Sequence, residues 1–306
     1  EKALAVSDVL SVMRDGKIIG GRVETEVSKA KVSRLMVGRE VSLKVERQSV
    51  ERGESVLEAR NLTVRGEDEL PLVDDVALDL HRGEILGIAA VQGNGQSELV
   101  ETLTGLREPS GGEISLRGQK LEAATPKKVR ALGLSYVPED RTEIGVAEEA
   151  TVIENLTLPY VGRPSFRRSG LLQEEHLRQK TEELVDKFDI TVSNPDSPVS
   201  SLSGGNVQKL VLARELSREP EVLLAAQPTR GLDIKTKRFV WEELLEKRSA
   251  ETGTLLVSSD LSEVRALSDR IAVMYEGRIV ARFDEPDQVS DEDLGLYMMG
   301  AKSKVV

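Results

Sequence analysis

A glycine-rich segment follows an apolar run in the first third of the sequence. The run, residues 84–91, is nearly all apolar, which is typical of a strand covered on both faces. A helical pattern follows at residues 98–105. The residues between them that could contact a phosphate are Gly93, Asn94, Gly95, Gln96 and Ser97. Because a helix N-terminus offers unpaired N–H groups and the positive end of its dipole, this order predicts a phosphate-binding loop.

The loop departs from the phosphate-loop pattern G-x-x-x-x-G-K-[ST] at two positions. Ala90 replaces the first glycine and Gln96 replaces the lysine, whereas Ser97 keeps the hydroxyl that ligates Mg²⁺. The missing lysine is the cation that would contact the β- and γ-phosphates. By itself the loop therefore fits two interpretations: a weak ATP site with Mg²⁺ at Ser97, or a turn that binds no ATP productively.

A second candidate anion site lies further downstream, at residues 202–209. A serine suited to cap a helix precedes two glycines, and the pattern at residues 210–216 is helical. The glycines leave backbone N–H groups open at the start of this helix, which suits a γ-phosphate. Taken alone, the segment also fits a capped surface helix. Its candidate binding residues are Ser203, Gly204, Gly205, Asn206 and Gln208.

The string Leu-Ser-Gly-Gly-Asn at residues 202–206 resembles the signature motif of ABC transporter ATP-binding cassettes, usually written LSGGQ. Its position after the glycine loop and before the apolar run at residues 222–226 is also similar to that family. This run would be the Walker B strand, and Gly231, Leu232 and Asp233 would belong to the D-loop that follows it. The resemblance covers essentially the whole chain. It implies an α/β P-loop cassette with an antiparallel β-subdomain and a helical signature subdomain.

Several positions that carry catalysis in the family hold other residues here. By the resemblance, Ala226 stands where an aspartate organises Mg²⁺, and Gln227 where a glutamate acts as general base. Ser259 takes the position of the switch histidine, and Glu139 that of the Q-loop glutamine. Because an amide cannot accept a proton from water, no catalytic residue is intact and this cassette alone is expected to hydrolyse ATP poorly. ATP and Mg²⁺ remain the implied cofactors, both bound weakly.

The retained motifs suggest a division of labour. Cassettes of the family pair head to tail, so each ATP lies between the phosphate loop of one cassette and the signature of the other. By the resemblance, this chain would lend Ser203, Gly204, Gly205 and Gln208 to its partner's site. Two alternatives stay open: a regulatory or structural module with a vestigial nucleotide site, and a soluble ABC ATPase outside transport. The second alternative predicts basic surfaces or coiled-coil insertions, which the sequence lacks.

An internal repeat indicates how the chain is organised. Residues 7–19 align without a gap on residues 268–280, and in both copies apolar residues flank a turn glycine. A second match, residues 35–38 with residues 297–300, has nearly the same offset. The expected parts are the tail of a preceding cassette at residues 1–40, a linker at 41–55 and the cassette itself at 56–306, with its β-subdomain at about 56–82 and its helical subdomain at about 140–200.

The composition excludes other classes of function. Charged residues make up 31% of the chain and the formal net charge is −11, whereas a broad nucleic-acid-binding surface needs clustered Lys and Arg. The chain has no cysteine and only two histidines, which speaks against thiolate and histidine metal centres. No apolar run approaches the roughly 20 residues that span a bilayer. The sequence therefore predicts no nucleic-acid partner.

The combined motifs are most similar to the second cassette of tandem ATPases that serve simple-sugar importers, and within them to the branch that imports nucleosides. This implies three partners: the first cassette of the same polypeptide, membrane permease subunits and, indirectly, an extracellular substrate-binding protein. It also implies a peripheral position on the cytoplasmic face of the plasma membrane, with an isolated fragment being soluble.

Overall fold

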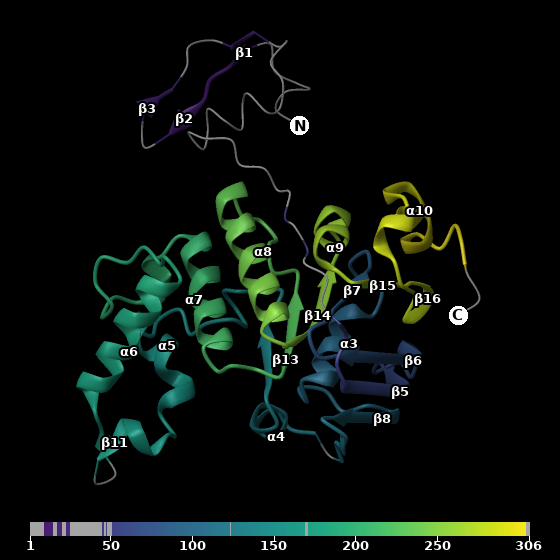
Figure 1. The fold of residues 1–306 in the computed structure, drawn as a ribbon, viewed down its shortest axis with the longest axis horizontal. Coiled ribbons are helices and arrows are strands. Elements are labelled where there is room, and N and C mark those ends of the chain that lie inside the picture. Colours follow the sequence, from purple (N-terminus) through teal and green to yellow (C-terminus); the bar gives the residue numbers. More distant parts are fainter. Residues whose placement is uncertain are drawn as a thin grey trace.

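A computed structural model describes residues 9–14, 17–19, 23–24, 45, 47 and 51–303, except residues 123 and 169–170. Most of the predicted tail at residues 1–40 and of the predicted linker at 41–55 lies outside the described residues. Figure 1 shows the cassette as a sheet flanked by helices, with a group of helices at one end.

A six-stranded sheet carries the predicted nucleotide-binding core, in the order β10-β13-β14-β7-β15-β16. The first five strands pair in parallel, and β16 closes the edge antiparallel to β15. The apolar runs at residues 84–91 and 222–226 form β7 and β13, whose residues are all buried, as are those of β14. The strands are β7 (Ile85–Ala89), β10 (Leu134–Val137), β13 (Val222–Ala226), β14 (Gly253–Ser258), β15 (Arg270–Tyr275) and β16 (Arg278–Phe283).

A four-stranded antiparallel sheet packs beside this core, in the order β6-β5-β8-β9. Two of its strands, β5 (Ser55–Arg65) and β6 (Pro71–His81), coincide with the predicted β-subdomain. The other two, β8 (Gly111–Leu116) and β9 (Gln119–Lys120), come later in the chain, after the phosphate loop. Strand β8 pairs with β5, and β9 pairs with β8. The pairing of β8 with β5 is non-local and has no signal in the local pattern.

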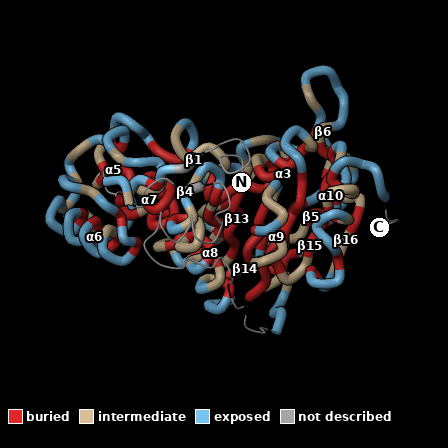
Figure 2. Tube along the Cα trace, turned by 90° about the horizontal axis from the view of Figure 1, so that it is seen from above, coloured by how far each residue is buried: buried red, intermediate tan, exposed pale blue. Residues whose placement is uncertain are grey.

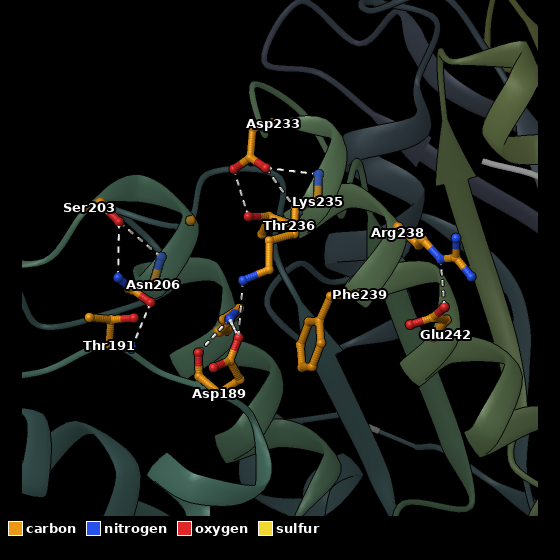
Figure 3. Close-up of a pocket in the computed structure, with 12 residues that line it drawn as sticks. Asp189, Thr191, Ser203, Asn206, Asp233, Lys235, Thr236, Arg238, Phe239 and Glu242 are labelled. Carbon is orange, nitrogen blue, oxygen red and sulfur yellow. Dashed lines mark hydrogen bonds and ion pairs between the residues drawn. The ribbon is translucent and has the colours of Figure 1, made fainter. Parts of the chain in front are cut away.

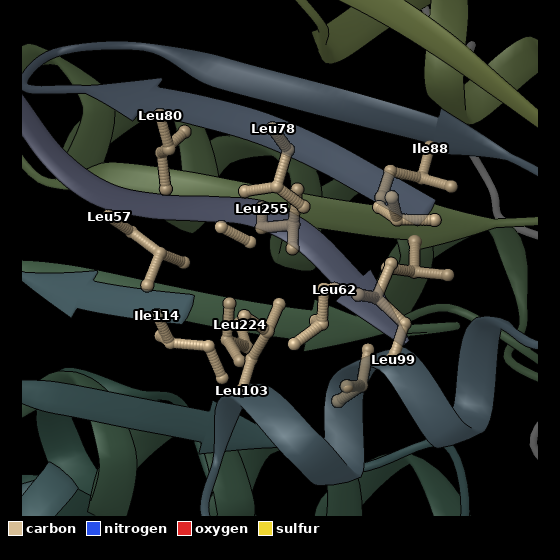
Figure 4. Packing of buried hydrophobic residues seen from close by; sticks show 14 of the residues in the cluster. Leu57, Leu62, Leu78, Leu80, Ile88, Leu99, Leu103, Ile114, Leu224 and Leu255 are labelled. Atoms are coloured by element: carbon tan, nitrogen blue, oxygen red, sulfur yellow. The ribbon is translucent and has the colours of Figure 1, made fainter. Parts of the chain in front are cut away.

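Helix α3 (Gln96–Leu103) lies between the two sheets and joins their cores. Figure 4 shows Leu99 and Leu103 of this helix among leucines from both sheets, including Leu62 of β5 and Leu224 of β13. Leu99, Leu103 and Leu62 have no exposed surface, and burying a leucine side chain stabilises the fold by about 2 kcal/mol. The helix that begins at the phosphate loop is therefore held rigidly.

The remaining helices cover the central sheet or form the helical subdomain. In Figure 1, α5, α6 and α7 form one end of the molecule, within and just after the predicted range of 140–200. The α-helices are α4 (Pro126–Ala131), α5 (Val152–Thr157), α6 (Glu174–Lys187), α7 (Gly204–Leu216), α8 (Ile234–Ser249), α9 (Leu261–Leu267) and α10 (Asp291–Met298). Short 3₁₀ turns span Leu158–Tyr160, Pro164–Phe166, Val199–Ser201 and Pro286–Gln288, and a small hairpin joins β11 (Arg167–Arg168) to β12 (Leu171–Leu172).

The described part of the N-terminal segment contains four short strands: β1 (Val9–Leu10), β2 (Met13–Arg14), β3 (Lys17–Ile18) and β4 (Val23–Glu24). Strand β2 pairs antiparallel with β3, Met13 opposite Ile18. In the second copy of the repeat, Met274 lies opposite Ile279 in the β15–β16 hairpin. Met13 aligns with Met274 and Ile18 with Ile279, so the two copies pair in the same register.

Figure 2 shows that the central strands are buried, whereas the turns at the helical end of the molecule are largely exposed. Within the part of the chain that the structure describes, no helix is both long and apolar enough to cross a membrane.

Candidate functional site

The predicted phosphate loop connects β7 to α3. Gly93 and Gly95 both have a left-handed backbone, with φ of 92° and 91°. A Cβ at Gly95 would lie 2.1 Å from the carbonyl oxygen of Leu72, so only glycine fits there. Beside Gly93, in contrast, a Cβ would meet no atom within 4 Å. The loop thus leaves open space at the point where a phosphate would approach the backbone.

Asn94 fixes this loop to the β15–β16 turn. Its side-chain oxygen accepts the N–H of Glu276 at 2.9 Å, and its carbonyl accepts the N–H of Gly277 at 3.0 Å. Its side-chain nitrogen donates to the carbonyl of Val91 at 3.0 Å. The side chain of Asn94 therefore shapes the loop, and a direct ligand contact would use its backbone.

Gln96, at the position of the missing lysine, turns into the loop and is only 2% exposed. Its side-chain oxygen accepts the N–H of Asn94 at 3.0 Å. Its side-chain nitrogen is buried and has no hydrogen-bond partner among the described residues. Since an unpaired buried donor is costly, this N–H is available to an acceptor such as a phosphate oxygen. The glycine cradle and this donor fit the phosphates of ATP.

A cavity of about 520 Å³, here called the loop cavity, opens beside Ser97. Glu139, the predicted Q-loop residue, lines it and accepts hydrogen bonds from Arg230 and, at 3.4 Å, from Gln92. Burial and the neighbouring carboxylates of Glu101 and Glu139 raise the pKa of Tyr136 to about 12. The cavity thus contains a phenol that is protonated at neutral pH and an arginine–glutamate ion pair.

Gln227 and Ser259, the predicted positions of the general base and the switch histidine, meet at the end of β13. The side-chain oxygen of Gln227 accepts the N–H and the hydroxyl of Ser259, at 3.2 and 3.3 Å. Ala226, at the aspartate position, presents only a methyl group to the loop cavity. The structure brings Gln227 and Ser259 together next to Ala226, and none of the three carries a carboxylate.

Sequence reasoning missed Glu263, which lies directly behind this centre. Its carboxylate accepts hydrogen bonds from Thr229 at 2.7 Å, Ser258 at 2.7 Å and Trp241 at 2.9 Å. Burial raises the pKa of Glu263, although these three hydrogen bonds act in the opposite direction. The only sequence signal was an acidic residue at the start of a short helical pattern, which does not reveal burial.

The signature segment forms the second surface of the candidate site. Ser203 is the N-cap of α7, where its hydroxyl accepts the N–H of Asn206 at 3.4 Å. The side chain of Asn206 donates to Ser203 at 3.1 Å and accepts the N–H of Thr191 at 2.9 Å. Ser203 and Gly204 are exposed and Gly205 is half-buried. The prediction of a capped helix N-terminus open to solvent is confirmed.

The prediction that Gln208 contributes to the partner's site disagrees with its position in the structure. Its side chain is 2% exposed, because α7 is buried continuously from Val207 onward. Gln208 follows Ser203 by more than one helical turn, which places it beyond the exposed start of the helix. Only Ser203, Gly204 and Gly205 remain as surface candidates among the four.

A pocket of about 620 Å³, the signature pocket, lies between the N-termini of α7 and α8 (Figure 3). Asp233 of the predicted D-loop caps α8 by accepting the N–H groups of Lys235 and Thr236 at 2.9 and 3.0 Å. Burial opposes ionisation of Asp233, but hydrogen bonds from Thr236 and Lys235 outweigh it and lower the pKa. Asp189 pairs with Lys209 at 2.7 Å on the opposite wall.

Arg141 connects the two surfaces and was also missed from the sequence. Its guanidinium donates to the carbonyl of Arg230 at 2.7 Å. The guanidinium also lies close to two glycines. A Cβ added at Gly204 would be 3.0 Å from it, and a Cβ added at Gly231 would be 3.8 Å from it. The neighbouring Leu232 packs on the core that contains α7. Arg141, two residues after the predicted Q-loop position, therefore contacts both the predicted D-loop and the predicted signature segment.

Comparison with known proteins identifies the same family. The model of the family described as "ABC transporter" matches residues 73–230. The guanosine import ATP-binding protein NupO of Bacillus subtilis is 38% identical over 98% of this chain and 58% of its own length. The glucose import ATP-binding protein TsgD13 of Haloferax volcanii is 41% identical over 98% of this chain and 55% of its own. The ribose import ATP-binding protein RbsA of Halalkalibacterium halodurans is 34% identical over 100% of this chain and 60% of its own length.

Solved structures agree on the fold. A nucleotide-free ATP-binding cassette from an ABC transporter has a TM-score of 0.67 at 20% identity, covering 80% of this chain and 99% of that one. A dimeric cassette in a post-hydrolysis state with ADP and Pi has a TM-score of 0.64 at 22% identity, covering 74% and 97%. The chain spans little more than half of the curated relatives named above. With its loops, strands and matched residues in place, the chain belongs to the ATP-binding cassettes of the ABC transporter family.

Proposed function

We propose that this chain is the second, degenerate cassette of a tandem ATP-binding protein, and that it supplies its signature segment to the ATP site of the first cassette. The contrast between its two surfaces carries the proposal. Ser203 caps an exposed helix N-terminus beside a large pocket, so the signature half of a site is intact. At the other surface, Ala226 and Gln227 hold no group that accepts a proton from water.

The tandem arrangement rests on two observations. The chain covers 55% to 60% of the length of the three relatives named above, which leaves room in each for a second cassette. The β2–β3 hairpin at its N-terminal end also repeats the register of the β15–β16 hairpin near its C-terminal end. Both fit residues 1–40 as the tail of a preceding cassette, residues 41–55 as a linker and residues 56–306 as the cassette that follows.

ATP is the ligand that we assign to the phosphate loop of this chain. ABC cassettes bind ATP, usually with Mg²⁺. Gly93 and Gly95 leave the backbone open, and the buried N–H of Gln96 offers a donor to a phosphate oxygen. Because Gln227 cannot act as a base, the bound ATP turns over slowly or not at all.

A groove next to the helical subdomain is suited to the membrane permease. It has a volume of about 580 Å³ and is lined by Ile144 and Leu158, whose side chains are 61% and 65% exposed. Exposed apolar side chains around a groove mark sites of protein association. Burial, together with the positive charge of nearby Arg130, lowers the pKa of Arg218 in the same groove. An apolar segment with an acidic residue would fit this surface.

The names of the relatives suggest what is carried. They import guanosine, glucose and ribose, so the proposed cargo of this transporter is a nucleoside or a simple sugar. The cargo would be selected by the permease and by an extracellular binding protein, and the cassette would lie peripherally on the cytoplasmic face of the membrane. Its acidic net charge of −11 opposes a nucleic-acid partner.

A second candidate function is a regulatory or structural module with a vestigial nucleotide site. The neutral pair of Gln227 and Ser259 favours it. The open signature surface opposes it, because a purely structural module has no need of an exposed helix N-terminus at Ser203 and Gly204.

One experiment distinguishes the two functions. Mg-ATP turnover by the first cassette, produced alone, is compared with turnover after this chain is added in equimolar amount. The proposed function predicts a large rise that Ser203→Arg removes. No rise, with the complex confirmed to form, would instead indicate a regulatory or structural module.

A further inference from the structure

An ion pair crosses the loop cavity. Arg230 of the D-loop segment donates to the carboxylate of Glu139 at the Q-loop position, although 91 residues separate them in the sequence. The side chain of Arg230 is 57% exposed and that of Glu139 is 21% exposed. Both line the same cavity as Ser97, so a ligand bound there can reach the guanidinium.

The donor set of this cavity does not fit Mg²⁺. The ion prefers octahedral oxygen ligands and is held in nucleotide sites by one or two carboxylates together with phosphates and water. Here Ala226 offers none and the oxygen of Gln227 is bound to Ser259. Each carboxylate that lines the cavity is already engaged: Glu139 by Arg230, Glu101 by Arg107 at 2.9 Å, and Asp140 by Thr142 at 2.8 and 2.9 Å.

Among the described residues, no group of three or more His, Cys, Asp or Glu side chains is arranged to hold a metal ion. Ser97 keeps its hydroxyl at the rim of the cavity. A single hydroxyl without a neighbouring carboxylate is a poor anchor for a cation that gives up its water reluctantly.

The same cavity does fit phosphate oxygens. Arg141 lines it, and its Nε is buried without a hydrogen-bond partner among the described residues. In the phosphate loop next to Ser97, the buried side-chain nitrogen of Gln96 also has no partner among the described residues. The N-terminus of α3 begins at Gly95 and adds the positive end of its dipole. The guanidinium of Arg230 presents a planar fork of donors, the geometry that binds phosphate through two hydrogen bonds.

We propose that the loop cavity binds a nucleoside triphosphate without a divalent cation, and that Arg230 supplies the positive charge that Mg²⁺ supplies elsewhere in the family. The inference rests on the part of the proposed function that assigns ATP to this phosphate loop. Glu139 then has a second role: it holds Arg230 in the cavity and neutralises it until a nucleotide arrives. A site of this kind retains nucleotide instead of hydrolysing it, because neither metal nor base is in place.

Calorimetric titration of the 306-residue chain with ATP, in excess Mg²⁺ and in excess EDTA, tests the proposal. We expect ATP to bind at least as tightly in EDTA, because Mg²⁺ in solution competes for the same phosphate oxygens as Arg230. A dissociation constant about tenfold larger in EDTA than in Mg²⁺, equivalent to about 1.4 kcal/mol of lost binding free energy, would overturn the proposal.

Arg230→Met provides the second measurement. Removing the guanidinium should weaken ATP binding in EDTA by about tenfold or more, the effect of a charge-assisted hydrogen bond. It also releases Glu139, so Mg²⁺ should restore part of the affinity of this variant. An Arg230→Met chain that binds ATP in EDTA like the wild type would contradict the role of Arg230.

Arg178→Met is the matched control. Arg178 makes a two-point ion pair with Asp196 at 2.8 and 2.9 Å, is similarly exposed, and lies on α6 outside the cavity. Its loss should leave ATP binding unchanged in both buffers, and circular dichroism checks that each variant is folded. If no ATP binds under either condition, both this inference and the assignment of ATP to the loop fail. The signature role, measured by stimulation of the first cassette, is tested separately.

Discussion

The side-chain oxygen of Gln227 accepts hydrogen bonds from both the N–H and the hydroxyl of Ser259, at 3.2 and 3.3 Å. Gln227 also has a left-handed backbone, with φ of 46°, and its N–H donates to the carbonyl of Val257 at 2.7 Å. The resemblance predicts a general base at this position. Here the two polar groups satisfy each other, and neither of them is a carboxylate.

Carboxylates placed at the end of β13 should make ATP binding depend on Mg²⁺. In the double variant Ala226→Asp, Gln227→Glu, two acidic groups stand at the end of β13 beside Ser97. Because Mg²⁺ prefers carboxylate oxygens, ATP binding to this variant should become about tenfold stronger when Mg²⁺ replaces EDTA. Calorimetric titration in both buffers measures the change.

Ala226→Asn is the control for charge, since it has nearly the same shape as Ala226→Asp and no carboxylate. It should leave the ratio of the two affinities as in the wild type. If the double variant also shows the wild-type ratio, the affinity for metal is not set by the residues at the end of β13.

The signature role predicts an asymmetry between the two nucleotide-binding surfaces. Ser203→Arg removes the cap of α7 and fills the approach to Gly204, so ATP turnover by the complete transporter should fall by about a hundredfold, as when a donor to a transition-state anion is lost. Gln96→Ala affects only the phosphate loop of this chain and should reduce turnover much less. Phosphate release from the reconstituted transporter gives both values.

Ser290→Arg controls for the loss of a helix cap. Ser290 caps α10 by accepting the N–H of Asp293 at 3.0 Å, away from both surfaces. Turnover should stay at the wild-type level in this variant. Equal losses from Ser203→Arg and Gln96→Ala would refute the asymmetric model.

The proposed permease groove predicts a loss of assembly when its apolar rim is charged. Ile144→Asp or Leu158→Asp should weaken association with the permease by about tenfold, because a carboxylate replaces an apolar contact in the centre of an interface. Co-purification from detergent measures the association. Leu171→Asp, at a residue that is 76% exposed on β12 and does not line the groove, should have no effect. Loss of assembly in all three variants would point to misfolding instead.

The buried Glu263 predicts a pH dependence of stability. Its pKa in the folded chain is raised above 4.5, so the folded state binds more protons than the unfolded state and stability falls as pH rises from about 4.5 towards the folded pKa. Glu263→Gln removes this titration and keeps an acceptor for Thr229 and Trp241. The free energy of unfolding of the wild type relative to this variant should therefore decrease with pH across that window, measured by urea denaturation.

For Asp233→Asn, the free energy of unfolding of the wild type relative to the variant should increase with pH, opposite to Glu263→Gln. The pKa of Asp233 is lowered below 3.8, because hydrogen bonds outweigh the effect of burial. The stability that Asp233 contributes is present above 3.8 and is lost as pH falls through the folded pKa. If the free energy of unfolding relative to wild type changed with pH in the same direction for both variants, the two carboxylates would not titrate as their surroundings indicate.

The sequence by itself determined the order of the elements and the identity of the motifs. The apolar runs that became β7 and β13 were predicted as strands of the core, because a strand covered on both faces must be apolar throughout. The cap at Ser203 was equally local, since the capping serine and the N–H that it accepts lie within three residues. The predicted absence of catalytic carboxylates at Ala226 and Gln227 needed only the identity of the residue at a motif position.

The tertiary structure alone decided which distant residues meet. Strand β8 pairs with β5 although the phosphate loop lies between them in the sequence. Gln208 lies on the buried part of α7. Glu263 accepts hydrogen bonds from β14, from α8 and from the turn after β13. Arg230 and Glu139 lie on different motifs and form an ion pair only because β10 and β13 are adjacent in the parallel sheet. Local patterns report burial and turns within a few residues, whereas such contacts depend on how the strands are ordered across the sheet.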